Sequence, residues 1–429
     1  MEKPLEKVTI EKLVHGGQGL ATLADGRRVF VWNALPSETV GVRIIKSKKS
    51  YAEAIAEEIM VPSELRLEPS ESNYLATSPW QIMTFTAENI YKREIVMELF
   101  RHEKVVLPVV SDTLHGDRQW NYRSKMEYSF WGDDDGLHLA LHMRGSHGKQ
   151  IVQGSKLALP AIDAAANAIC AQLNTLQARA GDLKTIIVRC DQQGNAVAAL
   201  YTKLEKFAEL QLPPELKGLR VYHSNPKSPA SVPTCLIYEL GNCLLHDKLL
   251  GKSFVYDVDS FFQVNLPVFE NALTTIKAFT GDGAVTDMYA GVGSIGLSAA
   301  TSQLTLVELD PASVRMAVQN ADDAIKISTD TDAFLDAQVV QASTEAALEY
   351  ITSEVTIVFD PPRAGLHDKV VQRVLDTLPP KVIYLSCNPA THARDLARLQ
   401  AGYNIVHFEI YNFFPRTPHI ETLAILTAK

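Results

Sequence analysis

One cysteine near the end of the chain stands where an apolar run gives way to a turn. Cys387 follows Lys381–Leu385, a run typical of a buried strand, and precedes Asn388 and Pro389. Ligands of open α/β sheets collect at the carboxyl ends of the strands, so a thiol here would face a substrate crevice. The alternative is a structural cysteine, because free Cys is among the most buried residue types. Cys387 is therefore a candidate nucleophile whose role depends on its neighbours.

Two carboxylates lie at the ends of other predicted strands. Asp360 follows the apolar run Val355–Phe359, and the two prolines after it stiffen the loop that leads to Arg363. Glu421 comes just before Thr422–Leu426, which is predicted to be the last strand. Taken alone, these features also fit a strand-ending turn and a surface glutamate. Together with Cys387 they make these strand ends a candidate site, and they favour the interpretation of Cys387 as a nucleophile.

A glycine-rich stretch, Asp287–Gly296, follows a predicted strand and opens a predicted helix. Gly291 and Gly293 would let the backbone approach a ligand closely, and Ser294 would begin the helix. Glu308 ends the next strand about twenty residues later, where a carboxylate can accept hydrogen bonds from ribose hydroxyls. The pattern predicts nucleoside binding and leaves two cofactor classes, a dinucleotide and S-adenosylmethionine (SAM).

The loop Asp360–Arg363 favours SAM, because an oxidoreductase that binds a dinucleotide has no role for this loop or for Cys387. Among SAM-dependent base methylases, amino-group methylases need an aromatic residue after the prolines to stack the base, and Arg363 stands there instead. RNA cytosine-5 methylases carry a cysteine in this loop, and this loop has none. Arg363 could meet an RNA phosphate or form a structural ion pair.

The elements that must position these residues begin after about residue 255, where strands and helices alternate. This rhythm predicts a doubly wound parallel sheet, Rossmann-like in form. The predicted strands are Ala284–Met288, Leu304–Glu308, Ala337–Gln341, Val355–Asp360 and Lys381–Leu385.

The first 62 residues predict a small OB-like β-barrel, because short strands alternate with glycine turns. Lys7–Val14 is predicted to be one of its strands. Lys46, Lys48, Lys49 and Tyr51 could touch an RNA backbone and stack a base, although a solvated hairpin tip has the same composition.

The rest of the chain predicts a helix over Glu88–Lys104, packed on the catalytic domain, and a central α+β domain with an antiparallel sheet and a helix over Ala158–Ala180. We expect four segments: a barrel over 1–62, a linker and helix over 63–105, the central domain over 106–254 and the catalytic domain over 255–429.

Composition sets wider limits. The 429 residues exceed one ordinary domain, and 46% hydrophobic residues support sizeable cores. Five cysteines without a close pair argue against a disulfide framework. A net charge of −9 gives no overall nucleic-acid signature. The chain shows no signal sequence and no run of membrane-spanning length, so we expect a cytoplasmic protein without a membrane partner.

The motifs, in their order along the chain, resemble the RNA uracil-C5 methyltransferase family, which makes 5-methyluridine in tRNA or 23S rRNA. The N-terminal His15–Ala21 is similar to the TRAM module of that family, an RNA-binding barrel, and Tyr122–Lys125 is similar to its central domain. The catalytic motifs are Phe261-Phe-Gln-Val-Asn265, Asp287-Met-Tyr-Ala-Gly291, Asp360-Pro-Pro-Arg363, Ser386-Cys-Asn-Pro389 and His419-Ile-Glu-Thr422.

The resemblance implies SAM-dependent methylation of carbon 5 of a uridine. Cys387 would add to C6 of the uracil, and Glu421 would accept the C5 proton, with Asp360 beside them. The source of stabilisation for a Cys387 thiolate is not apparent from the sequence. The implied SAM contacts are Gln263, Tyr289, Gly291, Gly293, Ser294, Glu308, Ser343 and Asp360.

The sequence departs from the family in three places. Many members carry a four-cysteine iron-sulfur cluster, but Pro69–Gln81 and the positions near Gly154 and Ser155 lack cysteine, so we expect no cluster and no metal. The pair Ala342-Ser343 replaces a usual glycine-aspartate, which puts an adenine contact in doubt. Asn412 stands where an aspartate is often found.

We expect RNA as the substrate, with 23S rRNA favoured because a TRAM-like barrel is commoner in the rRNA-modifying branch, and tRNA second. No obligate protein partner is expected. The alternative from another class is an RNA-binding or assembly factor that retains the methyltransferase fold with little activity. The intact pair of Cys387 and Glu421 argues against it.

Overall fold

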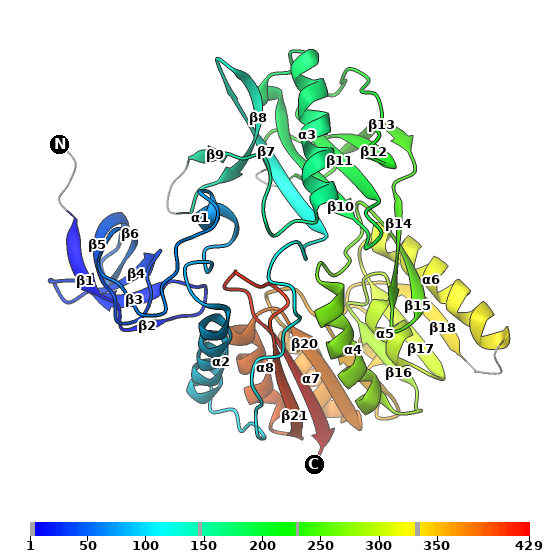
Figure 1. Cartoon of the computed structure of the whole chain (residues 1–429). Coiled ribbons are helices and arrows are strands. Elements are labelled where there is room, and N and C mark those ends of the chain that lie inside the picture. Colours follow the sequence, from blue (N-terminus) through cyan, green and yellow to red (C-terminus); the bar gives the residue numbers. More distant parts are fainter. Residues whose placement is uncertain (1–4, 145–147, 229–230, 331–334) are drawn as a thin grey trace.

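A computed structural model of the chain describes residues 5–144, 148–228, 231–330 and 335–429, with only the backbone for 327–330. Three bodies are visible in Figure 1: the N-terminal strands on one side, a central sheet above, and a large sheet with helices on both faces below. The α/β class, the Rossmann-like catalytic domain and the N-terminal β-rich module that the sequence predicts are confirmed. In the described residues no helix combines the length and apolarity needed to cross a membrane.

The N-terminal barrel is a six-stranded sheet in the order β1-β5-β6-β4-β3-β2. Alternate residues such as Val29 and Val31 are buried inside it. The single strand predicted over residues 7–14 is wrong, because the chain changes partners there: Ile10 donates to Glu38, whereas Glu11 donates to Leu20. The strands are β1 Glu6–Thr9, β2 Lys12–Leu13, β3 Gly19–Thr22, β4 Arg28–Trp32, β5 Thr39–Ser47 and β6 Tyr51–Val61.

After the short helix α1 (Tyr74–Thr77), helix α2 spans Phe85–His102 and begins at Thr84, whose side chain accepts a hydrogen bond from the Ala87 amide. Phe100 at its end contacts the ring of Phe408 in the catalytic sheet, 4.8 Å away between centroids. Helix α2 therefore packs with the catalytic sheet (Figure 1), far from it in sequence.

A buried polar cluster, Glu88, Lys92 and Asn412, also joins α2 to the catalytic sheet. Lys92 lies 3.1 Å from Glu88 and donates to the side-chain oxygen of Asn412 at 2.6 Å. The Asn412 amide donates to Glu88 at 2.8 Å, and Glu88 also accepts from the Arg416 backbone. Burial lowers the pKa of Lys92 to about 8, although Glu88 opposes this shift. Asn412 thus has a structural role, because its amide can donate and accept at once.

The central sheet has the order β13-β12-β11-β10-β7-β8-β9, with α3 (Pro160–Thr175) packed on it. The expectation of an antiparallel sheet is correct except for β11 and β12, which run parallel because 15 residues, 203–217, connect them. The helix is shorter than the predicted 158–180. The strands are β7 Lys125–Asp133, β8 Gly136–His142, β9 Lys149–Ile151, β10 Leu183–Cys190, β11 Ala196–Thr202, β12 Gly218–His223 and β13 Cys235–Gly241, and a short helix η1 spans Ala180–Asp182.

A two-stranded ribbon, β14 (Leu244–Leu249) and β15 (Lys252–Asp257), leads into the catalytic sheet, whose order is β18-β17-β16-β19-β20-β22-β21. Its strands are β16 Val285–Met288, β17 Gln303–Glu308, β18 Asp336–Gln341, β19 Thr356–Phe359, β20 Lys381–Ser386, β21 Tyr403–Tyr411 and β22 Glu421–Ala428. Its helices are α4 Leu266–Thr280, α5 Ser294–Ala299, α6 Pro311–Asp330, η2 Leu348–Tyr350, α7 Asp368–Thr377 and α8 Pro389–Leu399.

The five strands predicted between residues 284 and 385 run parallel, as expected, but the last strand of the chain runs the other way. β22 runs antiparallel to both β20 and β21. Only residues 412–420 separate β21 from β22, too short a connection for a parallel crossover, so the chain turns back as a hairpin. This reversal brings the start of β22 to the same edge of the sheet as the end of β20.

Candidate active site

Cys387 and Glu421 become neighbours because of the antiparallel pairing. Ser386, the last residue of β20, lies opposite Thr422, and the residues one step further along are Cys387 and Glu421. Glu421 is buried, with 3% of its surface exposed, whereas Cys387 is half-buried. Asp360 follows β19, the strand beside β20, so its loop opens at the same edge. The three residues predicted to be catalytic are thereby brought together.

Arg363 ties the loops of this edge to one another. Its backbone oxygen accepts hydrogen bonds from the Asn388 amide at 2.8 Å and the Thr391 hydroxyl at 3.2 Å. Its guanidinium Nη2 lies 3.2 Å from Nδ1 of His419. A guanidinium can only donate, so Nδ1 accepts and the imidazole of His419 carries its hydrogen on Nε2.

Three carboxyls form the acidic floor of the site: those of Asp287 and Glu421, which are buried, and that of Asp360, which is partly buried. Burial raises the pKa of Asp287 to about 8 and that of Asp360 to about 7. Burial, followed by repulsion from Asp360, raises the pKa of Glu421 well above its usual value, and Arg363 opposes the shift only in part. A cation bound against this floor would stabilise the ionised carboxylates.

In the protein without SAM or RNA, the surroundings of Cys387 favour its neutral thiol. Burial, and then the carboxylates of Glu421 and Asp360, raise its pKa to about 12. Arg363 is the side chain that opposes these effects. The source of thiolate stabilisation that the sequence did not show is thus one arginine, and it is outweighed by burial and two acids.

The glycine-rich turn fits a nucleoside cofactor by its shape and its donor set. A side chain at Gly293 would put Cβ 2.9 Å from Leu297 and Leu306, and Gly291 has a φ of +58°. One oxygen of Asp287 accepts from the Gly296 amide at 2.8 Å, while the other is buried without a partner among the described groups. An orphaned carboxylate oxygen is a costly feature that a hydrogen-bonding ligand could relieve.

Glu308 ends β17 as predicted, and its carboxylate is held by backbone amides. It accepts from Gly291 at 2.8 Å and from Leu309 and Asp310 at 2.7 Å. Oε1 accepts the bonds from Leu309 and Asp310, whereas Oε2 accepts only the bond from Gly291 and keeps a lone pair for a ligand hydroxyl. These bonds fix the carboxylate beside Gly291, where a ribose contact was predicted.

The other predicted SAM contacts lie around the same edge of the sheet. Tyr289 follows β16 with a φ of +68°, and burial raises the pKa of its hydroxyl to about 12. Ser343 follows β18, and Ser294 begins α5. Gln263 is buried in the loop before α4.

Of the residues predicted to bind RNA, only Arg363 lies beside Cys387. Lys46 forms an ion pair with Glu53 at 2.7 Å, and Tyr51 packs edge-on against Phe30. Lys48 and Lys49 are exposed at the hairpin tip. Among the described residues no hydrogen bond or ion pair joins this tip to the catalytic loops, and its RNA role stays a prediction.

Sequence reasoning missed a contact between the barrel and the nucleophile loop. The turn between β2 and β3 docks on the catalytic domain, since a side chain at Gly17 would overlap Pro418 and the Gly17 oxygen accepts from the Trp80 indole at 3.0 Å. Burial lowers the pKa of His15 in this turn, against a hydrogen bond with the side chain of Asn388 that raises it. One signal for this contact is present in the sequence, because His15 belongs to the motif His15–Ala21 that resembles the TRAM module.

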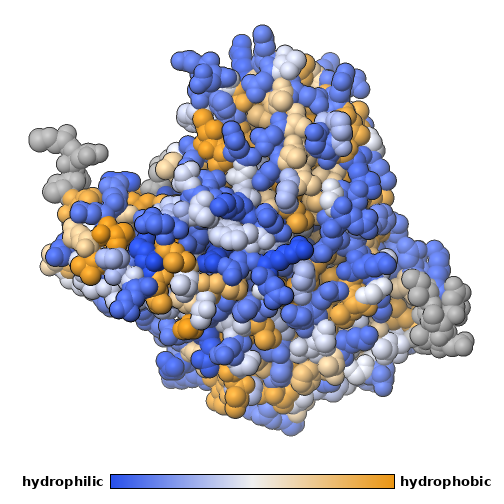
Figure 2. Space-filling view, in the orientation of Figure 1, coloured by the Kyte–Doolittle hydropathy of each residue, from blue (hydrophilic) through white to orange (hydrophobic). Residues whose placement is uncertain are grey.

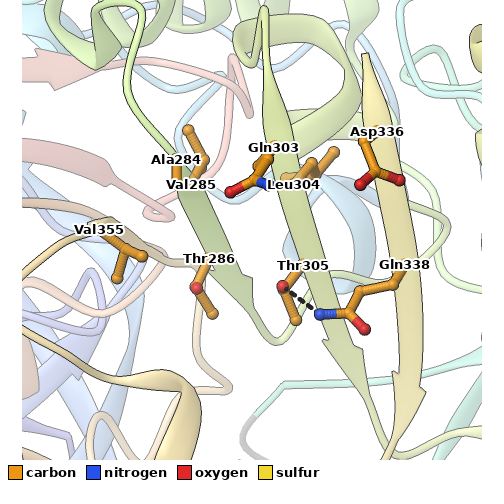
Figure 3. Close-up of a pocket in the computed structure, with 9 residues that line it drawn as sticks. All are labelled: Ala284, Val285, Thr286, Gln303, Leu304, Thr305, Asp336, Gln338 and Val355. Atoms are coloured by element: carbon orange, nitrogen blue, oxygen red, sulfur yellow. Dashed lines mark hydrogen bonds between the residues drawn. The ribbon is translucent and has the colours of Figure 1, made fainter.

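Other parts of the described structure offer no competing centre of chemistry. The pocket in Figure 3 is lined by Thr286, Thr305 and Gln338, with Gln338 donating to Thr305, and lies on the amino-terminal part of β16–β18, away from the catalytic loops. In residues 5–144, 148–228, 231–330 and 335–429, no group of three His, Cys, Asp or Glu side chains could hold a metal ion.

Comparison with known proteins agrees with this geometry. Residues 246–429 match the family described as tRNA (Uracil-5-)-methyltransferase, and residues 6–56 match the TRAM domain. Similar curated proteins include RNA methyltransferases of uncharacterised role from Nitratidesulfovibrio vulgaris and Enterococcus faecalis, each 28% identical over 450 residues, with 98% of this chain and 96% of the relative covered.

Among solved structures, the fold is similar to that of the tRNA (uracil-54, C5)-methyltransferase of Pyrococcus abyssi in complex with S-adenosyl-L-homocysteine. The TM-score is 0.74 at 20% identity, covering 98% of this chain and 100% of the other. The resemblance drawn from the motifs is confirmed: residues 246–429 carry the domain of the tRNA (Uracil-5-)-methyltransferase family, residues 6–56 carry a TRAM domain, and the relatives similar over the whole length are RNA methyltransferases.

Proposed function

We propose that the protein methylates carbon 5 of a specific uridine in cytoplasmic RNA, through a covalent adduct between Cys387 and C6 of the base. The observation that carries the proposal is the pairing of β20 with β22, which sets Cys387 beside Glu421 at the edge that also holds Asp360. The S-adenosyl-L-homocysteine bound by the Pyrococcus abyssi protein supports SAM as the methyl donor.

The residues present fit SAM. Gly291 and Glu308 would hold its nucleoside, and Asp287 and Asp360 would face its cationic part. When bound, SAM supplies an electrophilic methyl group and a positive charge. Asp287 and Asp360, whose pKa values burial has raised, would face that charge, so binding would favour their ionised forms.

The chemistry of the protein groups follows from their charges. The Cys387 thiol gives up its proton to solvent and its sulfur bonds to C6 of the uracil, while the electron pair of the 5,6 double bond passes to the carbonyl as an enolate. Carbon 5 can then take the methyl group, and the donor would leave as S-adenosyl-L-homocysteine. Glu421 removes the C5 proton, and the electron pair of that bond re-forms the double bond while the thiolate of Cys387 leaves. Glu421 must be ionised for this step, which the low-dielectric floor resists until a cation is bound.

A uridine can reach the half-buried thiol only if it is unstacked, so the target lies in a loop or is flipped out. For the RNA itself, 23S rRNA remains our first candidate. tRNA is the second, and it is supported by the description of the family and by the substrate of the Pyrococcus abyssi protein.

The test is mass spectrometry of the protein mixed with SAM and RNA that contains 5-fluorouridine. Fluorine cannot leave as a proton, so the methylated adduct on Cys387 should be trapped. Cys387→Ala is the matched control and should form none. Mapping of 5-methyluridine in rRNA and tRNA from cells with and without the gene then identifies the substrate. Absence of adduct and of 5-methyluridine change across both RNA classes would contradict the proposal and favour an RNA-binding or assembly factor.

A further inference from the structure

Three arginines from separate parts of the chain gather at the mouth of the site, and we name them the arginine cluster: Arg123, Arg144 and Arg363. Arg123 precedes β7, Arg144 lies in the turn between β8 and β9, and Arg363 follows β19. Two of them therefore come from the central domain and one from the catalytic domain.

Aromatic rings connect the members of the cluster. Arg123 lies over Phe414 at 5.8 Å, and the Phe414 ring meets the His419 ring edge-on at 5.5 Å. Arg363 donates to Nδ1 of the same His419 ring at 3.2 Å. Arg144 lies over Trp32 of the barrel at 4.8 Å, so all three bodies of the molecule meet here.

All three arginines lie close enough to His419 to affect its pKa. Burial, followed by Arg363, Arg123, Lys92 and Arg144, lowers the pKa of His419 to about 3. Burial and Arg363 also lower the pKa of Arg144. The imidazole is neutral, so it adds no positive charge of its own to the cluster.

None of the three arginines has an acidic partner within salt-bridge distance among the described residues. Arg123 donates to the backbone oxygen of Lys125 at 3.0 Å, and Nε of Arg144 is buried without a hydrogen-bond partner. Arg220 shows the contrast, because it contacts Glu239, Asp257 and Asp259. Arg123 and Arg144 are partly buried, whereas Arg363 is exposed. Partly buried cations without counter-charges are costly to the protein alone and are suited to an anionic ligand.

The cluster borders the reacting groups, since Arg363 also lowers the pKa of Cys387 and Glu421. Figure 2 shows strongly hydrophilic residues in a band across the middle of this face, between the lobe of the central sheet and that of the catalytic sheet. An RNA strand that delivers a base to Cys387 must pass this mouth.

We propose that Arg123 and Arg144, with Arg363, bind the RNA backbone phosphates next to the target uridine, so that the central domain and the barrel hold the strand over the nucleophile. This inference rests on the proposed function. It assigns the phosphate contacts nearest the reaction to the central domain, not to the lysines of the β5–β6 hairpin.

The test compares Arg144→Met with Arg179→Met, an exposed arginine of the central domain with the same change of charge. Methionine keeps an apolar stem against Trp32. At physiological salt, Arg144→Met should raise KM for RNA about tenfold, with kcat at saturating RNA within about twofold of wild type. The plot of log Kd for RNA against log salt concentration should become less steep, by the amount expected when about one phosphate contact is lost. SAM affinity should be unchanged, and Arg179→Met should match wild type in all four quantities.

Arg144→Lys provides the second variant in case methionine loosens the fold, which the melting temperature would reveal. It keeps the charge and should keep the salt slope, with a smaller rise in KM. An Arg144→Met enzyme that folds but has the KM and salt slope of wild type would overturn the inference while leaving the methylation itself intact. Loss of 5-fluorouridine adduct in wild type would instead overturn the proposed function.

Discussion

The two sides of the active site carry opposite charge, and both lack the counter-charge that they need. On the floor, burial raises the pKa of Asp287, Asp360 and Glu421. At the mouth, burial and neighbouring cations lower the pKa of His419 and Arg144. The floor is thus prepared for a cation and the mouth for an anion, with Cys387 between them. This division would keep the methyl donor and the RNA on separate sides of the thiol.

The largest effect is expected when the thiol of Cys387, which lies between the acidic floor and the basic mouth, is removed. Cys387→Ala should lower methylation by at least about a thousandfold, because no other thiol in the described structure lies beside Glu421. Binding of both SAM and RNA should survive, since the floor and the mouth are untouched. Radiolabelled methyl transfer and two separate binding titrations provide the measurement. A variant that still methylates would exclude a covalent route through Cys387.

Removing the proton acceptor should stop the reaction at a later stage. Glu421→Gln should lower turnover by about 10²- to 10⁴-fold, the usual contribution of a positioned base. The thiol can still add and the methyl group can still transfer, so an adduct with ordinary uridine RNA should accumulate. Denaturing gels and mass spectrometry would detect it. Loss of SAM binding in this variant would assign Glu421 to the cofactor instead.

The charge of the floor can be tested by pH. The carboxyl of Asp360 has a pKa raised to about 7 and that of Asp287 to about 8, so both become protonated as the pH falls below these values. SAM affinity should therefore weaken from pH 8.5 to pH 6, by up to about tenfold if Asp360 must ionise and up to about 80-fold if Asp287 must ionise, and protons should be released on binding. Asp360→Asn should weaken SAM binding about tenfold and reduce its pH dependence, whereas the exposed Asp282→Asn should behave as wild type. Calorimetry in buffers of different ionisation enthalpy measures the proton release, and a pH-independent affinity would exclude the acidic floor as the SAM site.

The smallest expected effect concerns the thiol itself. With a pKa near 12, alkylation of Cys387 in the enzyme alone should rise about tenfold per pH unit up to pH 10 without levelling, because only the thiolate reacts. Arg363→Met removes the one cation that lowers this pKa and should slow alkylation at pH 8 by about three- to tenfold. Peptide mass spectrometry gives the rate, with exposed Cys235 as an internal measure of reagent. An unchanged alkylation rate would show that Arg363 does not lower the pKa of Cys387.

Local sequence was sufficient for the catalytic motifs because each lies where one strand ends. Cys387, Asp360 and Glu308 could be placed at the carboxyl edge of the sheet from apolar runs and turns alone. The position of Glu421 beside Cys387 could not, because it depends on the reversal of β22, and pairing direction is not encoded in the strand's own residues.

The arginine cluster was beyond sequence reasoning for a different reason. Arg144 is a single arginine in a turn, and nothing in its neighbourhood marks it until the fold brings it near Trp32 and Arg363. The basic run Lys46–Lys49 attracted the RNA prediction through composition, yet Lys46 is paired with Glu53. A cation is available to bind an anion only if no acidic side chain already pairs with it. That pairing is decided by tertiary structure.

The polar cluster of Glu88, Lys92 and Asn412 has a consequence for how the chain can be divided. The family match begins at residue 246, but α2, which packs against the catalytic sheet, ends more than 140 residues earlier. A fragment starting at 246 would leave the amide of Asn412 and the ring of Phe408 exposed. The catalytic unit is therefore discontinuous along the gene, with the central domain inserted into it, and a split enzyme would need α2 supplied as a separate piece to regain its shape.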